Sequence, residues 1–259
     1  MEPDVARLAL DAGLEPASIV ILDLESGEAL GTLNPDRELY PASMIKTPLV
    51  AATLALVEDG SFGRDHRLEV TPANLTLNDD TSPLVAGYEA RVDELCELAI
   101  ASSDNVATNM LFDLVGRERA TAMAQQLFGL RRTAFHRKLS GSEPLIHDPE
   151  WDGVHRNAHP ASDAAALFRA IGLGTIPGSD LLRAALARQR WNGKLNLGLR
   201  DGDAFAHKTG DTSEVTHDGG ILHTAAGRSF VIVVYTGLSS TDGHNARFGP
   251  FMAGLRERL

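Results

Sequence analysis

The stretch YPASMIKTPL, Tyr40–Leu49, separates two kinds of sequence pattern. Before it, the β-rich runs Ser18–Leu24 and Glu28–Leu33 are joined by Glu25-Ser26-Gly27, which predicts a hairpin of two antiparallel strands. A short helix at Pro3–Ala12 precedes this hairpin. After Tyr40–Leu49, apolar residues recur every three or four positions, which predicts helices. The stretch therefore marks the passage from a sheet to a helical region.

The remaining predicted elements place helices in the middle of the chain and strands again at its end. Apolar periodicity predicts helices at Ser43–Glu58, Arg91–Ser102, Asn105–Val115, Glu118–Leu127, Ser162–Ile171 and Ser179–Arg190. Strand patterns follow at Asp203–Gly210, Gly219–Thr224 and Ser229–Gly237. The last apolar face, Phe248 to Leu259, predicts a helix that Pro250 should begin or kink.

Strands from both chain ends around a helical middle predict an α+β fold. We expect an antiparallel sheet with flanking helices and an all-helical middle subdomain. The chain is expected to form one domain over 1–259, with a sheet half from about 1–40 and 195–259 and a helical half from about 41–194. A ligand cleft is expected between the halves. The segment 136–160 is longer than most loops, and long loops in compact domains are often functional.

Composition excludes several classes of protein. With 259 residues, 43% of them hydrophobic and 23% charged, the chain can bury a sizeable core. A net charge of -11 argues against a nucleic-acid partner, which would need a basic surface. The short basic segment Arg131–Lys138 is interpreted as solvated or ion-paired surface. The single cysteine, Cys96, excludes an internal disulfide and is expected to be a buried small hydrophobe.

The amino terminus has no basic region followed by a long apolar core, and no run approaches the roughly 18 apolar residues of a membrane span. The sequence thus predicts no signal peptide and no membrane segment. The protein is expected in the cytoplasm if Met1 is its native start, and in the periplasm or outside the cell if a leader was removed. The protein is expected to be a monomer.

Ser43 and Lys46 form the Ser-x-x-Lys of the opening stretch and allow two interpretations. Residues i and i+3 share one helical face, so Lys46 in its neutral form could take the Ser43 proton and make that serine a nucleophile. A helix start would also direct the backbone N–H of Ser43 toward a developing oxyanion. Alternatively, Ser43 merely caps the helix. The pattern alone does not decide between these interpretations.

Two further motifs decide the interpretation: Ser103-Asp104-Asn105 and Lys208-Thr209-Gly210. Each arises by chance roughly once in several thousand residues. With Ser-x-x-Lys, and in this order, they are the motif set of the penicillin-recognising serine hydrolases. The sequence resembles that family over nearly its whole length, most closely the class A β-lactamase branch. The resemblance implies the β-lactamase/transpeptidase-like fold, acyl-enzyme chemistry on a small-molecule β-lactam or D-alanyl peptide, and no cofactor.

The resemblance also implies roles for single residues. Ser103 would pass a proton to the leaving nitrogen, and Asn105 would bind the substrate's side-chain amide. Lys208 and Thr209 would bind a substrate carboxylate, and Gly210 would permit close backbone approach. The backbone N–H of Asp211 would complete the oxyanion hole. Read without the family, Ser103-Asp104-Asn105 would cap the next helix and Lys208 would be a solvated strand residue.

The base that releases the acyl group is the weakest part of the resemblance. Class A enzymes place a glutamate in their long loop as Glu-x-x-Leu-Asn, and the best candidate is Glu143, followed by Ile146 and His147. Counting back from Pro160 supports Glu143 as a catalytic residue, whereas counting forward from Ser103 places the position near Leu139. Glu143 is equally interpreted as a solvated loop carboxylate or as an ion-pair partner of the basic segment Arg131–Lys138.

Two other features concern carboxylate binding and metal binding. Some class A enzymes carry an arginine on the last strands beside the Lys-Thr-Gly lysine, but that stretch offers Phe230, with Arg228 and His217 nearby. The long loop holds metal-ligand types, listed as His147, Asp148, Glu150, Asp152, His155 and His159. Gly153 and Pro160 break the helix that a histidine pair would need, so no metal site is predicted.

Three functions therefore compete. A class A type β-lactamase needs a working deacylation base. A penicillin-binding D-alanyl-D-alanine peptidase, or an esterase-like relative, turns β-lactams over slowly or not at all. A binding or sensor module is acylated and remains so.

Overall fold

The computed structural model describes residues 4–78, 80–140, 146 and 148–259. Within these residues, a five-stranded antiparallel sheet has the order β2-β1-β7-β6-β5. The strands are β1 Ala17–Asp23, β2 Ala29–Leu33, β5 Ala204–Asp211, β6 Thr216–His223 and β7 Ser229–Thr236. The first and the last strands of the chain pair directly, since Ala17 of β1 lies opposite Thr236 of β7. The sheet is thus built from both chain ends.

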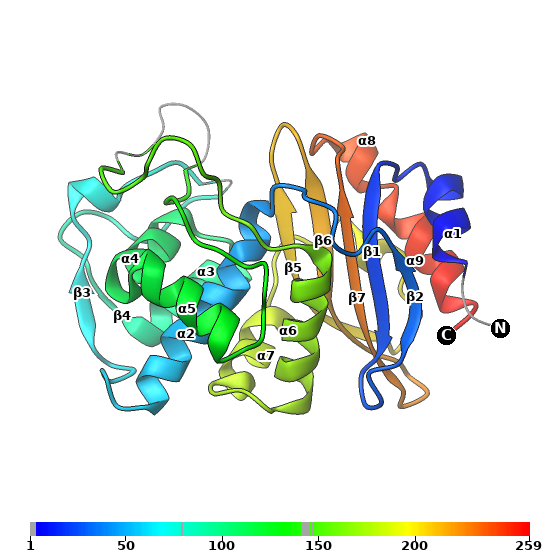
Figure 1. Ribbon diagram of the computed structural model, residues 1–259, viewed down its shortest axis with the longest axis horizontal. Helices are drawn as coiled ribbons and strands as arrows, with labels where there is room; N and C mark the ends of the chain where they lie inside the picture. Colours follow the sequence, from blue (N-terminus) through cyan, green and yellow to red (C-terminus); the bar gives the residue numbers. More distant parts are fainter. Residues whose placement is uncertain (1–3, 79, 141–145, 147) are drawn as a thin grey trace.

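Helices cover both faces of this sheet (Figure 1). Helices α1 Val5–Ala12 and α9 Phe248–Arg256 pack on one face, and α6 Ala161–Leu173 packs on the other, across β1, β6 and β7. Alternate side chains of β7 enter the two cores: Phe230, Ile232 and Val234 face α9, while Val231, Val233 and Tyr235 face the helical half. A strand buried on both faces needs apolar residues throughout, which explains the continuous run SFVIVV.

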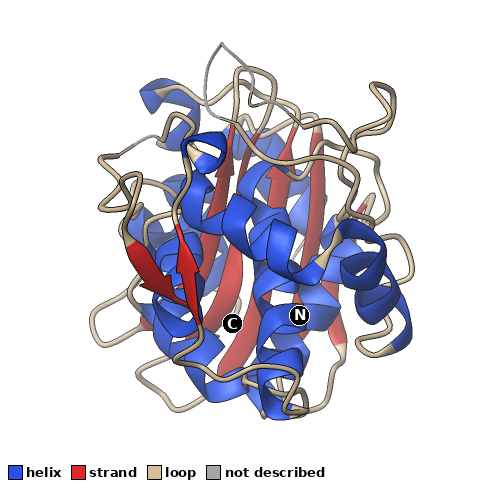
Figure 2. Cartoon of the chain, turned by 90° about the vertical axis from the view of Figure 1, so that its left-hand side faces the viewer, coloured by secondary structure: helices blue, strands red, loops and turns tan. Residues whose placement is uncertain are grey.

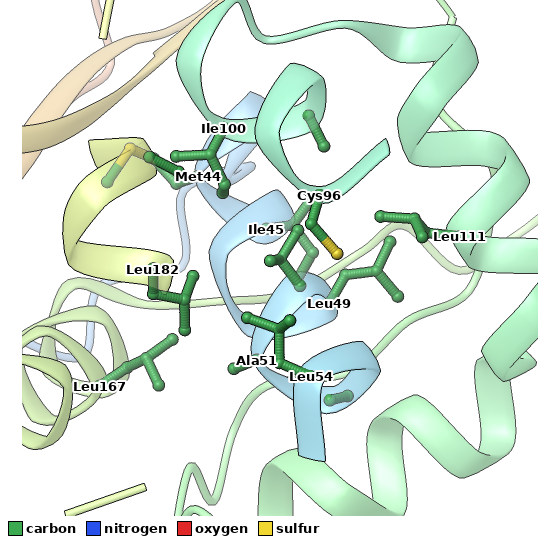
Figure 3. Packing of buried hydrophobic residues seen from close by; sticks show 14 of the residues in the cluster. Met44, Ile45, Leu49, Ala51, Leu54, Cys96, Ile100, Leu111, Leu167 and Leu182 are labelled. Atoms are coloured by element: carbon green, nitrogen blue, oxygen red, sulfur yellow. The ribbon is translucent and has the colours of Figure 1, made fainter. Parts of the chain in front are cut away.

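Helix α2 Lys46–Glu58 is the central helix of the helical half. Every residue from Lys46 to Leu56 is buried. Leu49 and Leu54 of α2 are surrounded by side chains of neighbouring helices, shown in Figure 3 as Cys96, Ile100, Leu111, Leu167 and Leu182. Truncating Leu49 to alanine would cost about 2–5 kcal/mol, because the cavity left in such packing closes only partly.

The other helices of this half surround α2: α3 Val92–Ala101, α4 Asn105–Val115, α5 Arg117–Gln126 and α7 Ser179–Ala187. The 3₁₀ turn η1 Ala42–Ile45 leads directly into α2. Cys96 is 5% exposed, and burial raises the pKa of its thiol, so the expectation of an inert buried cysteine is confirmed. No helix in the described part of the chain is long and apolar enough to cross a membrane.

Each predicted helix and strand is present, and the α+β class is confirmed. Strand β6 begins three residues earlier than predicted, at Thr216. Pro250 lies in the first turn of α9, where its missing N–H costs no helical hydrogen bond.

Several short elements have no counterpart among the predicted ones: β3 Arg67–Glu69, β4 Glu89–Arg91, η2 Pro72–Asn74, η3 Leu195–Gly198 and α8 Asp242–Asn245. Strands β3 and β4 form a small ribbon of their own, apart from the main sheet (Figure 2).

Candidate active site

The three motifs lie on three separate elements that meet where the helical half adjoins β5. Ser43 lies in η1 and Lys46 is the first residue of α2. Ser103 lies in the connection between α3 and α4, and Lys208 lies in β5. The chain segments that carry them are 57 and 105 residues apart, so only the folded chain brings them together.

Lys46 is fully buried and its ammonium nitrogen faces the Ser103-Asp104-Asn105 motif. Its Nζ donates to the Ser103 carbonyl oxygen at 2.5 Å, to Asn105 Oδ1 at 2.7 Å and to Ser103 Oγ at 3.1 Å. Asp104 caps α4, because its carboxylate accepts from the backbone N–H of Ala107 at 2.9 Å. The motif thus both starts a helix and binds the buried lysine.

Lys208 contacts the hydroxyl oxygen of the same serine. Its Nζ donates to Ser103 Oγ at 2.9 Å and to the Thr209 carbonyl oxygen at 2.8 Å. A serine oxygen has two lone pairs, and Lys46 and Lys208 supply two donors to them. The Ser103 hydroxyl proton must therefore point elsewhere, where it is available to a third group.

Ser43 and Ser103 open onto one cleft of about 780 Å³. Ser43 is half-buried, while Lys46 and Lys208 lie below the surface. Thr209 and Asp211 of β5 line the cleft beside the two serines. The remaining wall is formed by Arg190, Trp191, Asn192, Gly193, Lys194, Leu197, Thr212, Ser213, Ser240, Asp242, Asn245 and Ala246.

Strand β5 is the edge of the sheet, and this sets the direction of its backbone groups. The His207 carbonyl accepts from Gln189 Nε2 and the Thr209 carbonyl accepts from Lys208 Nζ, so both point away from β6. In an antiparallel pair this direction repeats at every second residue. The N–H of Asp211 therefore also points away from β6, as an oxyanion hole on this edge requires.

The backbone beside both serines adopts an unusual conformation. Ala42, just before Ser43, has a φ of 47°, and Ser103 itself has a φ of 58°. Residues other than glycine rarely occupy this left-handed region, and those that do concentrate at functional sites. Two of the left-handed residues other than glycine thus lie at or directly beside the two serines of the cleft.

The model of the beta-lactamase enzyme family matches residues 2–248. The chain belongs to this family. It is 26% identical to the beta-lactamase regulatory protein BlaB of Streptomyces cacaoi, over 98% of this chain and 96% of that protein. The solved structure of an ancestral class A beta-lactamase is 27% identical and superposes with a TM-score of 0.83, over 100% of this chain and 99% of that one. The expected β-lactamase-like fold is confirmed.

A second solved structure is similar over almost the same length. It is a leucine-to-glutamate variant of PBP-A, determined as an acyl-enzyme complex with penicillin G. Its sequence is 26% identical, and its TM-score is 0.81 over 98% of this chain and 96% of that chain. The beta-lactamase fold of this chain is thus close both to class A enzymes and to PBP-A.

Within this beta-lactamase fold, Glu143 and His147 lie outside the described residues. The nearby Leu139 is buried, and the side chain of Asn109 holds it through two hydrogen bonds: Nδ2 to the Leu139 carbonyl at 2.6 Å and Oδ1 from the Leu139 N–H at 2.8 Å. Asn109 lies one turn after Asn105 on α4, so the two share a helical face. Leu139 is therefore anchored close to the partner of Lys46.

The other loop residues considered as metal ligands interact with protein side chains. Asp148 and Glu150 pair with Arg117 at 2.7 and 3.2 Å, Asp152 pairs with His155 at 2.5 Å, and His159 Nδ1 lies 2.8 Å from Thr133 Oγ1. Among the residues that the structure describes, no three potential ligands gather around one point. Lys138 pairs with Asp113 at 2.7 Å, in keeping with an ion-paired Arg131–Lys138 segment.

Lys194 and Trp191 are cleft residues that the sequence motifs did not reveal. Lys194 Nζ contacts Asp211 Oδ1 at 2.7 Å. Although burial raises the pKa of the Asp211 carboxyl, Lys194 and hydroxyl donors hold that pKa below its ordinary value. Phe230 and Arg228, by contrast, are remote: Phe230 lies in the core beneath α9, with Arg228 stacked on it. For Trp191 and Lys194, the signal in the sequence is the stretch WNGK, in which the turn dipeptide Asn-Gly stands between an aromatic residue and a cation.

Proposed function

We propose that this beta-lactamase family protein is a serine hydrolase that reacts with β-lactams through an acyl-enzyme at Ser43. The observation that carries the proposal is the convergence of Lys46 and Lys208 on Ser103 Oγ, beside Ser43 in one cleft. In this arrangement, Lys46 would serve as the proton acceptor and Ser103 as the proton donor. Membership of the family and the acylated PBP-A neighbour support the substrate class.

In the acylation step, Ser43 Oγ attacks the carbonyl carbon of the four-membered amide. To act as the base, Lys46 must first lose one of the three ammonium protons that it donates to Ser103 and Asn105. As the neutral amine it then takes the Ser43 proton. The backbone N–H groups of Ser43 and Asp211 bind the carbonyl oxygen as it becomes an anion. The carbon–nitrogen bond then breaks, Ser103 gives its proton to the leaving nitrogen, and Lys46 passes the proton it took from Ser43 to Ser103 Oγ, which lies 3.1 Å from its Nζ. The product is a Ser43 ester that carries the opened ring.

Lys208 and Thr209 are proposed to hold the substrate carboxylate. Lys208 is fully buried and Thr209 lines the cleft beside Ser43. A carboxylate placed there would receive one charged and one neutral hydrogen bond. Penicillins and D-alanyl peptides both carry such a carboxylate next to the amide that breaks, so this subsite suits either substrate.

Release of the ester separates two candidate functions. A β-lactamase needs a carboxylate to activate water, and Glu143 is the proposed base. A slow penicillin-binding enzyme lacks one. The position of Leu139 favours this second candidate, because Asn109 holds the Leu139 backbone one helical turn from Asn105, the partner of Lys46, and Leu139 carries no carboxylate. Loss of a positioned general base slows a reaction by roughly 100- to 10,000-fold.

The test follows turnover and intact mass together. The protein is mixed with penicillin G and, separately, with a chromogenic cephalosporin. Rapid turnover without a lasting adduct supports the β-lactamase. A stable adduct that disappears in Ser43→Ala supports the penicillin-binding enzyme. If neither signal appears, both candidates are rejected, and cleavage of a D-alanyl-D-alanine peptide or a simple ester becomes the activity to measure.

A further inference from the structure

His207 of β5 lies on the opposite face of its strand from Lys208, and both of its ring nitrogens meet oxygen acceptors. Nδ1 lies 2.7 Å from Asp218 Oδ1, and Nε2 lies 3.0 Å from Asn192 Oδ1. His207 is 1% exposed and Asp218 is fully buried. Asp218 Oδ2 accepts from the backbone N–H of Leu195 at 3.0 Å.

The protonation of His207 depends on the orientation of the Asn192 amide. Asn192 Nδ2 donates to the carbonyl oxygens of Gln189 at 2.9 Å and Arg190 at 3.3 Å. Carbonyl oxygens only accept, so turning this amide over would place oxygen against oxygen. Asn192 Oδ1 must therefore face His207, and Nε2 must donate to it. A histidine that donates from both nitrogens is the charged imidazolium.

His217 on the neighbouring strand β6 provides a contrast. Its Nε2 donates to the Tyr40 carbonyl at 2.8 Å, while its Nδ1 accepts from the Thr236 N–H at 3.1 Å. One donor and one acceptor define the neutral ring. Burial lowers the pKa of His217 to about 4, in agreement with that state. Two buried histidines on adjacent strands are thus held in opposite protonation states by their partners.

The ion pair of His207 and Asp218 holds a segment that forms one wall of the cleft. Residues 189–195 wrap around the edge strand β5: Gln189 reaches the Ile100 carbonyl on one side, and Leu195 reaches Asp218 on the other. The two residues of the ion pair hold this segment through two hydrogen bonds, one between His207 and the Asn192 side chain and one between Asp218 and the Leu195 N–H. Between them lie Gly193 and Lys194, which line the cleft.

We propose that His207 is a positioning residue, a buried imidazolium that pairs with Asp218 and fixes the wall Trp191–Lys194 for substrate binding. Its role in catalysis rests on the proposed function, but its charge and its grip on the wall do not. A buried ion pair contributes little net stability, because both charges lose their water. Its contribution here is to orient the segment, because a pair of apolar side chains could not form hydrogen bonds to both the Asn192 amide oxygen and the Leu195 N–H.

The charge is tested by nitrogen NMR of the protein labelled with ¹⁵N-histidine, at pH 7. His207, assigned by its absence in His207→Gln, is expected to carry a proton on both ring nitrogens. His217 provides the internal reference with one. A single protonated nitrogen on His207 would overturn the proposal, whatever the enzyme's activity.

The positioning of the wall Trp191–Lys194 by His207 and Asp218 is tested by the fluorescence of Trp191 in a Trp151→Phe background. His207→Gln and Asp218→Asn are each expected to raise quenching by acrylamide at least 2-fold. His223→Gln is the matched control, because His223 is an exposed histidine of the same sheet. Unchanged quenching in both test variants, with a retained circular dichroism spectrum, would refute the positioning role.

The catalytic consequence is measured by stopped-flow acylation with a chromogenic cephalosporin. His207→Gln should raise the dissociation constant of the encounter complex about 10-fold, while the first-order acylation rate changes less than about 3-fold. The double variant with Asp218→Asn should lose no more than either single variant, because both remove one interaction. Losses that multiply would contradict the pairing. If wild type is not acylated, the proposed function fails, and the NMR and fluorescence results still decide this inference.

Discussion

Gly210 of β5 lies against Pro41 so closely that a Cβ on Gly210 would stand 2.9 Å from the Pro41 carbonyl oxygen. The same added carbon would meet Ala42 Cβ at 3.3 Å. Gly210→Ala must therefore push the segment that carries Ser43 away from β5. We expect at least a 10-fold loss in the acylation rate and about 1–3 kcal/mol of lost stability, as for other overpacked sites. Intact mass against time and urea unfolding measure the two effects.

The matched control is Gly243→Ala, because an added Cβ on Gly243 meets no atom within 4 Å. It should acylate at the wild-type rate. Equal rates for Gly210→Ala and wild type would mean that the backbone contact does not position Ser43.

Ser103 is expected to transfer a proton during acylation, so Ser103→Ala should slow adduct formation by about 100- to 10,000-fold. Ser102→Ala serves as the control, because the Ser102 hydroxyl donates only to the Leu98 carbonyl in its own helix turn, at 3.0 Å. Rates are read from intact mass at several β-lactam concentrations. If both alanine variants slow the reaction equally, the loss reflects a disturbed loop rather than a missing proton donor.

Deacylation is assigned by two substitutions in the long loop. If Glu143 activates water, Glu143→Gln should accumulate the adduct and lengthen its lifetime about 100-fold or more. If the position belongs to Leu139, Glu143→Gln should behave as wild type, and Leu139→Glu should shorten the lifetime of the adduct. The lifetime is followed by mass after removal of free β-lactam. A Leu139→Glu variant that folds but releases the adduct no faster would exclude that position.

Acid should destabilise the protein before its carboxylates are protonated. Burial lowers the pKa of His217 to about 4 and that of His159 to about 3, whereas each would titrate near 6.5 in the unfolded chain. The unfolded chain therefore binds protons first as the pH falls. The stability contributed by these two neutral histidines is fully present above pH 6.5 and should decline below it by up to about 1.4 kcal/mol per pH unit for each histidine.

Urea unfolding at pH 7, 6 and 5 measures this decline. His217→Gln should reduce the slope with pH, and the exposed His223→Gln should leave it unchanged. A free energy of unfolding that stays constant from pH 7 to pH 5 would contradict the burial of two neutral histidines.

The elements that sequence patterns identified are those with long apolar periodicity. Helix α2 is apolar on all sides and β7 is apolar on both faces, so each has a strong local signal. Strands β3 and β4 have three residues each, which is too short for any period to emerge. The start of β6 was missed because Thr216, His217 and Asp218 are polar residues buried by their partners in other strands.

The residues of the candidate site likewise fall into those that sequence motifs predicted and those that they did not. Ser43, Lys46, Ser103 and Lys208 belong to short motifs with fixed spacing, and the fold brings all four to one place. Lys194 and Asn192 had no such motif, because their role comes from contacts with Asp211 and His207 across the edge of the sheet. Glu143, whose register the sequence left open, lies outside the described residues.

The pairing of β1 with β7 also has a consequence for folding during synthesis, because the sheet is complete only when both chain ends have been made. Ser43 is synthesised early, and Lys208 follows 165 residues later. Strand β1 cannot pair with β7 along its full length until residue 236 has been added. Pairing between such distant segments is slow to form. The segments that carry Ser43, Lys46 and Ser103 are therefore synthesised well before the strands that complete the sheet and the candidate site.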